Sequence, residues 1–373
     1  MEQPLAPYSV CNLAAVNLAE MVNKDTNQVN YDKLIDTVQV GVRMQDNVID
    51  ATPYFLEDNK VQALGERRVG LGVMGLADLL IYCEKEYGSS EGNELVENVF
   101  KTIATTAYRE SIEIAKEKGS FPFLIGKTDE ETKALRNAYI NTGFMKKMPK
   151  DIREGVLQHG IRNSHLLTVA PTGSTGTMVG VSTGLEPYFS FSYYRSGRLG
   201  KFIEVKASIV EEYLQRHPEA DPDNLPGWFV SSMSLSPEAH ADVQCIIQRW
   251  IDSSISKTVN APRGYSVKQV ESVYERLYKG GAKGGTVYVD GSRDAQVLTL
   301  KAEENTMETE MVEEVIEQRK VVLINTIQDL RSTNVTIGSE IGNTCPVCRQ
   351  GTVEEIGGCN TCTNCNAQLK CGL

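Results

Sequence analysis

Six of the nine cysteines in this 373-residue chain crowd into the interval from Cys345 to Cys371. Two Cys-x-x-Cys pairs stand out there: Cys345 with Cys348, and Cys362 with Cys365, separated by an insert of hairpin length. Four thiolates at this spacing are typical of a tetrahedral structural zinc site in a zinc ribbon. We therefore expect these four cysteines to bind zinc.

Two cysteines of the same interval, Cys359 and Cys371, are left over once the four ligands are assigned. A surplus dithiol after a long linker is suited to thiol–disulfide exchange. The sequence therefore predicts a redox-active pair in the tail, and the choice of these two thiols rests on spacing alone.

The start of the sequence holds another reactive pair, Glu2 and Cys11, in a segment that contains Pro4 and Pro7. Prolines at this spacing disfavour a helix and favour an extended path. A carboxylate and a thiol could therefore share one site. Composition alone favours a different interpretation, a solvated glutamate and a buried structural cysteine.

A loop rich in glycine and hydroxyl groups follows the apolar segment 166–170. Its residues are Ala170, Pro171, Thr172, Gly173, Ser174 and Thr175. Such a loop exposes backbone N–H groups and hydroxyls that suit phosphate oxygens, although the Lys-Ser/Thr ending of a Walker loop is absent. The alternative is an ordinary turn between a strand and a helix.

Gly70, Gly72 and Gly75 form a G-x-G-x-x-G pattern. The sequence shows no clear strand before it and no acidic residue at the end of a second strand, which a dinucleotide site requires. We expect these glycines to permit close backbone packing before a helix.

Elements that would position these groups alternate along the chain. Apolar residues at helical spacing predict helices, and short apolar runs predict strands. The expected helices are 32–49, 76–87, 91–118, 128–139, 150–158, 205–214, 236–255 and 266–279, and the expected strands are 12–19, 166–170 and 286–289. This alternation predicts a mostly parallel α/β fold.

Composition excludes several classes of function. The net charge is −11 and no basic stripe exists, which argues against binding to nucleic acid. The sequence contains no run of 18 apolar residues that would predict a membrane span. It also has no basic segment at its start that would predict a signal peptide. The cysteine pattern favours a reducing compartment, so we expect a cytoplasmic protein.

Several motifs, in this order, resemble the large chains of ribonucleotide reductases. They are Pro4-Leu-Ala-Pro-Tyr-Ser-Val-Cys-Asn-Leu-Ala-Ala-Val-Asn-Leu18, Asp46-Asn-Val-Ile-Asp50, Arg67-Arg-Val-Gly-Leu-Gly-Val-Met-Gly-Leu-Ala-Asp78, Ala170-Pro-Thr-Gly-Ser174, Ser254-Ile-Ser-Lys-Thr-Val-Asn-Ala-Pro262 and Thr286-Val-Tyr-Val-Asp-Gly-Ser-Arg293. The cysteine-rich tail resembles class II, the adenosylcobalamin-dependent branch. The resemblance implies the C-terminal half of a ten-stranded α/β barrel over 1–298, a flexible linker over 299–343, and a zinc-ribbon and redox tail over 344–373.

The resemblance also assigns roles to residues. Glu2 matches the glutamate of the catalytic Asn-x-Cys-x-Glu loop, which acts as a general base, and Cys11 matches the second cysteine of the redox pair. The loop 170–175 matches the loop that binds the substrate phosphates. Tyr288 matches a tyrosine near the radical cysteine. The family's asparagine, radical cysteine and first redox cysteine would precede this sequence, so we expect the chain to be split or truncated within the catalytic loop.

The activity implied is the reduction of ribonucleotides, expected to be diphosphates, by thiyl-radical chemistry with a dithiol reductant. The implied cofactors are adenosylcobalamin and structural zinc. The implied partners are an N-terminal reductase chain carrying the radical cysteine, and thioredoxin or glutaredoxin, in an oligomeric enzyme. Two alternatives stay open: a non-catalytic zinc-ribbon interaction module derived from a reductase, and a reductase whose radical comes from a metal-containing subunit.

Overall fold

The computed structural model describes residues 2–197, 200–222, 224–292, 298–299, 338–356 and 359–371. The chain forms two compact units, Met1–Ala302 and Glu303–Leu373. The predicted end of the linker, at residue 343, thus falls inside the second unit. Most of the predicted linker, 299–343, lies outside the described residues. No helix in the described part of the chain combines the length and the apolarity needed to cross a membrane.

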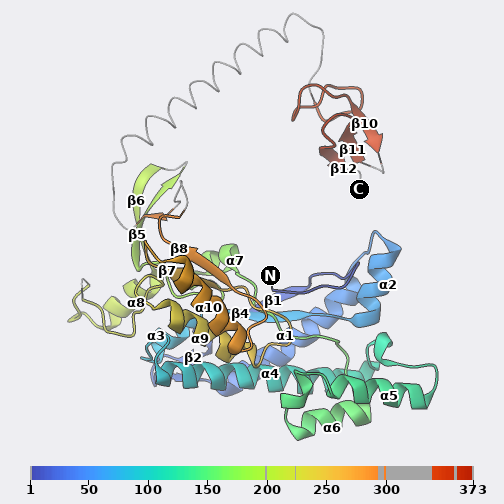
Figure 1. Cartoon of the computed structure of the whole chain (residues 1–373), viewed down its shortest axis with the longest axis horizontal. Helices are drawn as coiled ribbons and strands as arrows, with labels where there is room; N and C mark the ends of the chain where they lie inside the picture. Colours follow the sequence, from blue (N-terminus) through green and yellow to red (C-terminus); the bar gives the residue numbers. More distant parts are fainter. Residues whose placement is uncertain are drawn as a thin grey trace, which may run out of the picture. The chain divides into compact units, whose positions relative to one another are not determined.

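Parallel strands form the centre of the first unit (Figure 1). β1 (Leu13–Asn17) pairs in parallel with β4 (Gly70–Met74), and Leu13 stands opposite Gly70. The segment 166–169 lies on the other side of β4, through a parallel bridge between Leu71 and Leu167. Its residues are buried, as predicted, although only isolated bridges connect it to its neighbours.

The row of strands continues beyond segment 166–169. Val169 bridges in parallel to Ile255, and the chain then runs into β7 (Thr258–Ala261), which pairs in parallel with β8 (Thr286–Val289). The order is therefore β1, β4, 166–169, 254–261, β8. Among the described residues no strand pairing joins β1 to β8, so the row is open, and the predicted half of an α/β barrel is seen here as an α/β row.

Helices of the first unit pack against this row, as α1 does against β1 and α9 against β7. They are α1 (Tyr31–Ala51), α2 (Glu57–Glu66), α3 (Leu76–Tyr82), α4 (Ser90–Lys118), α5 (Asp129–Ile140), α6 (Lys150–His159), α7 (Gly173–Val179), α8 (Ser208–Arg216), α9 (Pro237–Gln248) and α10 (Val267–Lys279). Short 3-10 helices are η1 (Leu18–Met21), η2 (Pro122–Leu124) and η3 (Met145–Lys147). Outside the row lie β2 (Val22–Asn23) with β3 (Gln28–Val29), and β6 (Gly200–Lys206), β5 (Ser192–Gly197) and β9 (Leu298–Thr299).

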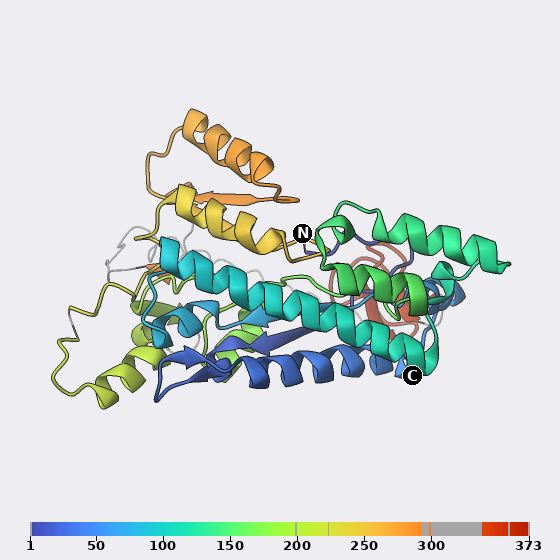
Figure 2. The same cartoon turned by 90° about the horizontal axis from the view of Figure 1, so that it is seen from below.

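The long helix α4 organises the packing around the strands. It lies alongside α1 and also packs against α6 and α9, as Figure 2 shows from below. Its buried side chains include Phe100, Ile103 and Tyr108, which join the main hydrophobic core. Ser89 caps its first turn, and Gly119, with φ of +85°, ends it. Burial of this apolar face is the main stabilising contribution of the helix.

Most predicted helices are confirmed, with three corrections. The helix predicted over 205–214 starts only at Ser208, because Val205 and Lys206 belong to β6. The helix predicted over 76–87 ends at Tyr82. The helix predicted over 236–255 ends at Gln248. Ile251 and Ile255 continue the apolar spacing beyond its end because both pack in the core.

The three glycines of the G-x-G-x-x-G pattern serve packing, as predicted. A Cβ atom at Gly72 would lie 2.4 Å from the carbonyl oxygen of Thr168, on the neighbouring segment of the row. A Cβ at Gly70 would lie 2.3 Å from the side chain of Gln3. Gly75 adopts a φ of +76° just before α3. The pattern thus lets two buried strands and the first residues of the chain approach closely.

The second unit contains a small antiparallel sheet. Its strands are β10 (Val353–Ile356), β11 (Cys359–Cys362) and β12 (Gln368–Cys371), in that order. The buried residues Cys345, Val353 and Cys362 form its core. So small a core is insufficient on its own, and metal ligation is the usual remedy.

Replacing Gly72 with alanine should destabilise the first unit by about 1–3 kcal/mol, because the added methyl group meets a backbone oxygen that cannot move aside. Urea denaturation followed by tryptophan fluorescence measures this, since Trp228 and Trp250, the chain's 2 tryptophans, both lie in the first unit. Gly143→Ala is the control, because a Cβ there meets no atom within 4 Å. Equal midpoints for the two variants would contradict the packing role of Gly72.

Candidate functional site

Glu2 lies against the middle of the parallel row. Its backbone carbonyl accepts a hydrogen bond of 2.9 Å from the N–H of Ser254. The hydroxyl of Thr168 lies within hydrogen-bonding reach of the carbonyls of both Glu2 and Ser254, and donates its one proton to either. The neighbouring Gln3 is buried and donates from its side chain to the carbonyl of Val69 at 3.4 Å. The first residues are therefore anchored to three adjacent segments of the row.

Cys11 lies two residues before β1, in a segment that is clamped on both sides. Asn12 and Gln45 exchange two hydrogen bonds of 3.0 Å, each side-chain amide donating to the other residue's carbonyl. On the other side the hydroxyl of Ser9 donates to the carboxylate of Glu66. Cys11 itself is a solvent-exposed free thiol. The clamp fixes the backbone and leaves the thiol available to a partner.

Glu2 and Cys11 are coupled electrostatically. Partial burial, and second the negative charge of Glu2, raise the pKa of the Cys11 thiol. A raised pKa keeps the thiol protonated near neutral pH, so it can donate a proton. The charge of Glu2 therefore acts on the Cys11 thiol, and because that thiol is exposed, the composition-based interpretation of a buried structural cysteine is wrong.

A cavity of about 310 Å³ opens beside Cys11. Glu66, Arg68 and Tyr54 contribute to its lining together with Leu13 at the start of β1. Glu66 and Arg68 are buried and form an ion pair, with 3.4 Å between Arg68 Nε and Glu66 Oε2. Sequence reasoning missed these two residues, although Arg68 stood within one of the quoted motifs.

The loop 170–175 begins where segment 166–169 ends. Gly173, Ser174 and Thr175 are exposed and form the first residues of α7. Thr172, just before the helix, adopts a left-handed backbone conformation with φ of +49°. This conformation is rare for a β-branched residue, and it needs support from the surrounding structure.

The direction of the strands places the three predicted groups in order, from the amino-terminal to the carboxyl-terminal end of the strands. Cys11 precedes β1 at the amino-terminal end of the strands. Glu2 hydrogen-bonds to Thr168, mid-row, and the loop beginning at Ala170 follows two residues later, at the carboxyl end.

Tyr288 lies on β8, opposite Asn260 of β7, and is partly buried. β7 continues the chain segment that contains Ser254, the hydrogen-bond partner of Glu2. Tyr288 therefore belongs to the same row, one strand further along.

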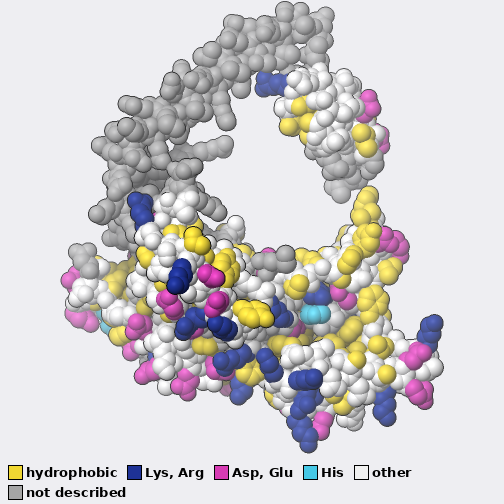
Figure 3. Space-filling model, in the orientation of Figure 1, with side chains coloured by type: hydrophobic (Ala, Val, Ile, Leu, Met, Phe, Trp, Pro, Cys, Tyr) yellow, Lys and Arg dark blue, Asp and Glu magenta, His cyan; other side chains and the backbone are white. Residues whose placement is uncertain are grey.

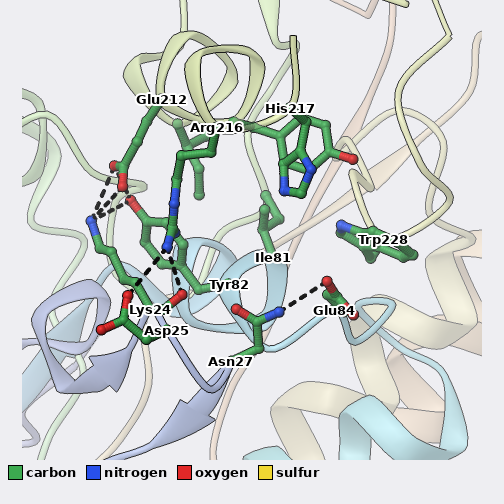
Figure 4. A pocket seen from close by; sticks show the side chains of 12 residues that line it. Lys24, Asp25, Asn27, Ile81, Tyr82, Glu84, Glu212, Arg216, His217 and Trp228 are labelled. Atoms are coloured by element: carbon green, nitrogen blue, oxygen red, sulfur yellow. Dashed lines mark hydrogen bonds and ion pairs between the residues drawn. The ribbon is translucent and has the colours of Figure 1, made fainter. Parts of the chain in front are cut away.

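Another cavity, of about 370 Å³, lies between the β2–β3 turn and α8 (Figure 4). None of the predicted site residues lines it. Lys24 bonds to Tyr82 at 3.0 Å and to Glu212 at 2.9 Å, so the central charges of this cavity compensate one another. It is not the site that the sequence predicts.

Four cysteines of the second unit come together. The sulfur atoms of Cys345, Cys348, Cys362 and Cys365 all lie within 4.8 Å of one another. Backbone N–H groups of Gly351 and Asn364 donate to the sulfurs of Cys348 and Cys362 at 3.5 and 3.4 Å. Such hydrogen bonds lower the pKa of Cys348 to about 5. Four cysteine sulfurs this close together fit the ligand set of a tetrahedral zinc ion.

The other two tail cysteines stand on neighbouring strands. In the antiparallel pairing of β11 with β12, Cys359 is opposite Cys371. Their side chains lie outside the described residues, so the predicted redox pair is supported by backbone register only.

The fold and the site define an α/β protein in which a thiol, a carboxylate and a candidate phosphate loop line a parallel row of strands. Comparison with known proteins gives the family. Residues 1–288 match the family model described as "Ribonucleotide reductase, barrel domain". The chain belongs to the ribonucleotide reductase family.

Curated relatives include two vitamin B12-dependent ribonucleoside-diphosphate reductases. The protein from Mycobacterium tuberculosis is 31% identical over 319 residues, which cover 81% of this chain and 41% of the relative. The protein from Thermoplasma acidophilum is 32% identical over 332 residues, covering 84% of this chain and 39% of the relative. The alpha subunit of the Chlamydia pneumoniae ribonucleoside-diphosphate reductase is 27% identical over 309 residues. The chain spans about two fifths of the length of its B12-dependent relatives.

Replacing Glu2 with glutamine should lower the pKa of Cys11, because it removes the negative charge that disfavours the thiolate. At pH 8 alkylation of Cys11 by iodoacetamide, followed by mass spectrometry of its peptide, should therefore be faster in E2Q than in the wild type. Glu20→Gln, which alters an exposed acid in η1, should leave the rate unchanged. An unchanged rate in E2Q would show that the two groups do not interact.

Replacing Cys348 with serine should abolish stoichiometric zinc binding and unfold the second unit, since four thiolates are needed for a structural site. Elemental analysis of the purified chain measures the metal. Cys11→Ser should retain one zinc ion per chain. Zinc retained in C348S, or absent from the wild type, would count against this ligand set.

Proposed function

We propose that this chain is the C-terminal component of a ribonucleoside-diphosphate reductase, which converts ribonucleotides to 2′-deoxyribonucleotides. The observation that carries the proposal is the coupling of Glu2 to Cys11 beside a loop suited to phosphate. The names of the relatives support diphosphates as the substrate class.

The chemistry follows from the roles that the family motifs imply. A thiyl radical on a cysteine of the partner chain abstracts the 3′ hydrogen of the ribose, and Glu2 accepts the proton of the 3′ hydroxyl as general base. The 2′ hydroxyl leaves as water after protonation by one thiol of the redox pair. Cys11 and the partner's cysteine end as a disulfide, and the radical cysteine is regenerated, so the two electrons come from the dithiol.

The residues around the pair serve this chemistry. The raised pKa keeps Cys11 protonated until its proton is needed. The anchored carbonyl of Glu2 limits the movement of its carboxylate, which helps to keep the base within reach of one hydroxyl. The loop 170–175 would hold the diphosphate through backbone N–H groups and the hydroxyls of Ser174 and Thr175. Tyr288 is proposed to lie near the radical cysteine.

Cys359 and Cys371 are proposed to reduce the disulfide of the active site. Residues directly opposite in an antiparallel pair have Cα atoms about 4.5–5.5 Å apart, a separation that a disulfide can span. The pair could therefore cycle between a dithiol and a cross-strand disulfide. Thioredoxin or glutaredoxin would return it to the dithiol form by thiol–disulfide exchange.

Two cofactors are proposed. Zinc, held by Cys345, Cys348, Cys362 and Cys365, would fix the fold of the tail. Adenosylcobalamin, supported by the B12 dependence of the relatives, supplies the radical when bound. The free thiols of the chain fit a reducing compartment, and we propose the cytoplasm.

An N-terminal reductase chain is the proposed partner, and it would carry the radical cysteine. The open row leaves strand edges that another polypeptide can pair with. Hydrophobic side chains are also exposed over α2 and the loop before it, where Figure 3 shows them in yellow. They are Phe55, Leu56 and Val61, of which Phe55 is 91% exposed. Exposed apolar clusters of this kind are typical of contacts between polypeptides, and they favour an oligomeric enzyme.

Two other functions are weaker. A non-catalytic zinc-ribbon module would not need the coupled pair of Glu2 and Cys11. A reductase whose radical comes from a metal-containing subunit is less favoured, because the relatives of 31% and 32% identity are named vitamin B12-dependent.

Co-expression with a polypeptide that corresponds to the N-terminal part of the B12-dependent relatives should yield a complex that reduces CDP to dCDP with thioredoxin and adenosylcobalamin. E2Q and Cys11→Ser should each lower the turnover by at least about a hundredfold, because each removes a group that takes part in a proton or electron transfer. The control Glu20→Gln should turn over normally. A chain that stays folded, monomeric and unbound beside its partner would refute the proposal, and activity without adenosylcobalamin would favour the metal-containing subunit.

A further inference from the structure

The loop 170–175 rests on a second segment, 182–188, that is held at both ends. At Ser182 the backbone N–H donates to Asp78 Oδ2 at 2.7 Å, and the hydroxyl of Tyr188 donates to Asp78 Oδ1 at 2.6 Å. Asp78 is 1% exposed and lies in the first turn of α3. One buried carboxylate thus ties both ends of the segment together.

A buried lysine holds the middle of this segment. The side chain of Lys257 is 0% exposed, and its Nζ lies 3.0 Å from Glu186 Oε2. The other oxygen of Glu186 accepts a hydrogen bond of 2.7 Å from the N–H of Thr258. The ammonium group therefore fixes Glu186 to the end of the strand segment that enters β7.

The environment of Lys257 satisfies its remaining hydrogens. Nζ donates to Nδ1 of His240 at 3.1 Å and lies 5.6 Å from the centre of the Tyr87 ring. His240 Nε2 in turn donates to the carbonyl of Ser232 at 3.0 Å. Burial and the adjacent ammonium group lower the pKa of His240 to about 3. His240 therefore stays neutral, and its Nδ1 can accept the hydrogen bond from Lys257. A lysine so fully enclosed is costly to bury, and it is retained only where its partners need it.

The segment 182–188 in turn supports the unusual backbone of Thr172. The N–H of Gly184 donates to Oγ1 of Thr172 at 2.8 Å. A Cβ at Gly184 would lie 3.0 Å from the carbonyl oxygen of Ala170, so the two backbones are in close contact. Thr172 has a φ of +49°, in the region that β-branched residues avoid. Gly184, two residues before Glu186, is therefore the direct support of the loop.

We propose that Lys257 is a positioning residue for substrate binding: through Glu186 and Gly184 it holds Thr172 in its left-handed conformation and so presents the loop 170–175 to the substrate diphosphate. The inference rests on the proposed function, because it assumes that this loop binds the diphosphate. Lys257 is too deeply enclosed to touch the substrate, and its effect is on affinity.

Removal of the ammonium has a defined consequence. In Lys257→Met the carboxylate of Glu186, whose side chain is 25% exposed, keeps its bond to Thr258 but loses its charge partner, so water must replace the ammonium group. Glu186 would turn toward solvent and draw Gly184 away from Thr172. Thr172 would relax to an ordinary backbone conformation, and the N–H groups that follow it would no longer converge.

The test measures CDP binding by equilibrium dialysis and turnover in the complex with the N-terminal partner. K257M should weaken CDP binding and raise KM at least about tenfold, with kcat changed less than about threefold. The rate of Cys11 alkylation should stay unchanged. Lys24→Met is the matched control, because Lys24 also pairs with a glutamate, Glu212, but lines the cavity of Figure 4; CDP binding should be unaffected.

A second substitution separates positioning from a general loss of stability. Asparagine adopts the left-handed conformation readily, and its side-chain oxygen can accept the N–H of Gly184. Thr172→Asn combined with K257M should therefore restore CDP affinity to within about threefold of the wild type without restoring the Tm. If K257M does not fold, Glu186→Gln, which keeps an acceptor for Thr258, should show the same loss of affinity and the same rescue.

Three outcomes would overturn the inference or its basis. Normal CDP affinity in a folded K257M refutes the role of Lys257. Failure of Thr172→Asn to restore affinity in a folded K257M or E186Q refutes the route through Thr172. Absence of CDP binding by the wild-type complex refutes the proposed function itself, before any variant is compared.

Discussion

Hydrogen bonds to the carbonyl of Glu2 are the constraint on which the candidate site depends. Ser254 donates to that carbonyl, and Thr168 lies within reach of it, so the first residues of the chain are joined to the centre of the row. Gly70 and Gly72 leave the space that this path requires. Without these contacts Glu2 would have no fixed relation to Cys11 or to the loop 170–175. The close approach of the first residues to the central strands therefore contributes both to the packing of the strands and to the position of Glu2 in the site.

The site combines ion pairs that hold the backbone with exposed groups that suit its proposed chemistry. Ion pairs hold the backbone on both sides: the buried pair of Glu66 with Arg68 near Cys11, and the pair of the partly buried Glu186 with the buried Lys257 near the loop 170–175. The thiol and the loop themselves remain exposed. Groups proposed to meet a substrate or another polypeptide are thus accessible, while most of the charges that position them are buried and little screened by salt.

Much of the fold could be predicted from local patterns. The helices α1, α4 and α10 followed from apolar residues at helical spacing, because this signal acts over a few residues. The four zinc-ligand candidates followed from spacing alone, and their sulfurs come together. The predictions of the start of α8 and the end of α9 were wrong. Val205 belongs to strand β6, and Ile251 packs in the core beyond the end of α9.

Other parts of the site depend on contacts between distant residues, which local patterns do not reveal. Composition favoured a buried Cys11, whereas its thiol is exposed in a segment that Gln45 and Glu66 hold through Asn12 and Ser9. Lys257 stood within a motif, yet its pairing with Glu186, 71 residues away, could not be read from the sequence. Cys11 is proposed to form a disulfide with a cysteine of a partner chain during turnover. The direct test is one turnover of CDP without thioredoxin by a complex in which the chain carries Cys359→Ser and Cys371→Ser, so that no tail dithiol can reduce the disulfide, followed by alkylation and peptide mass spectrometry. One Cys11 disulfide to the partner chain is expected for each dCDP formed. Formation of dCDP with Cys11 still a free thiol would contradict it.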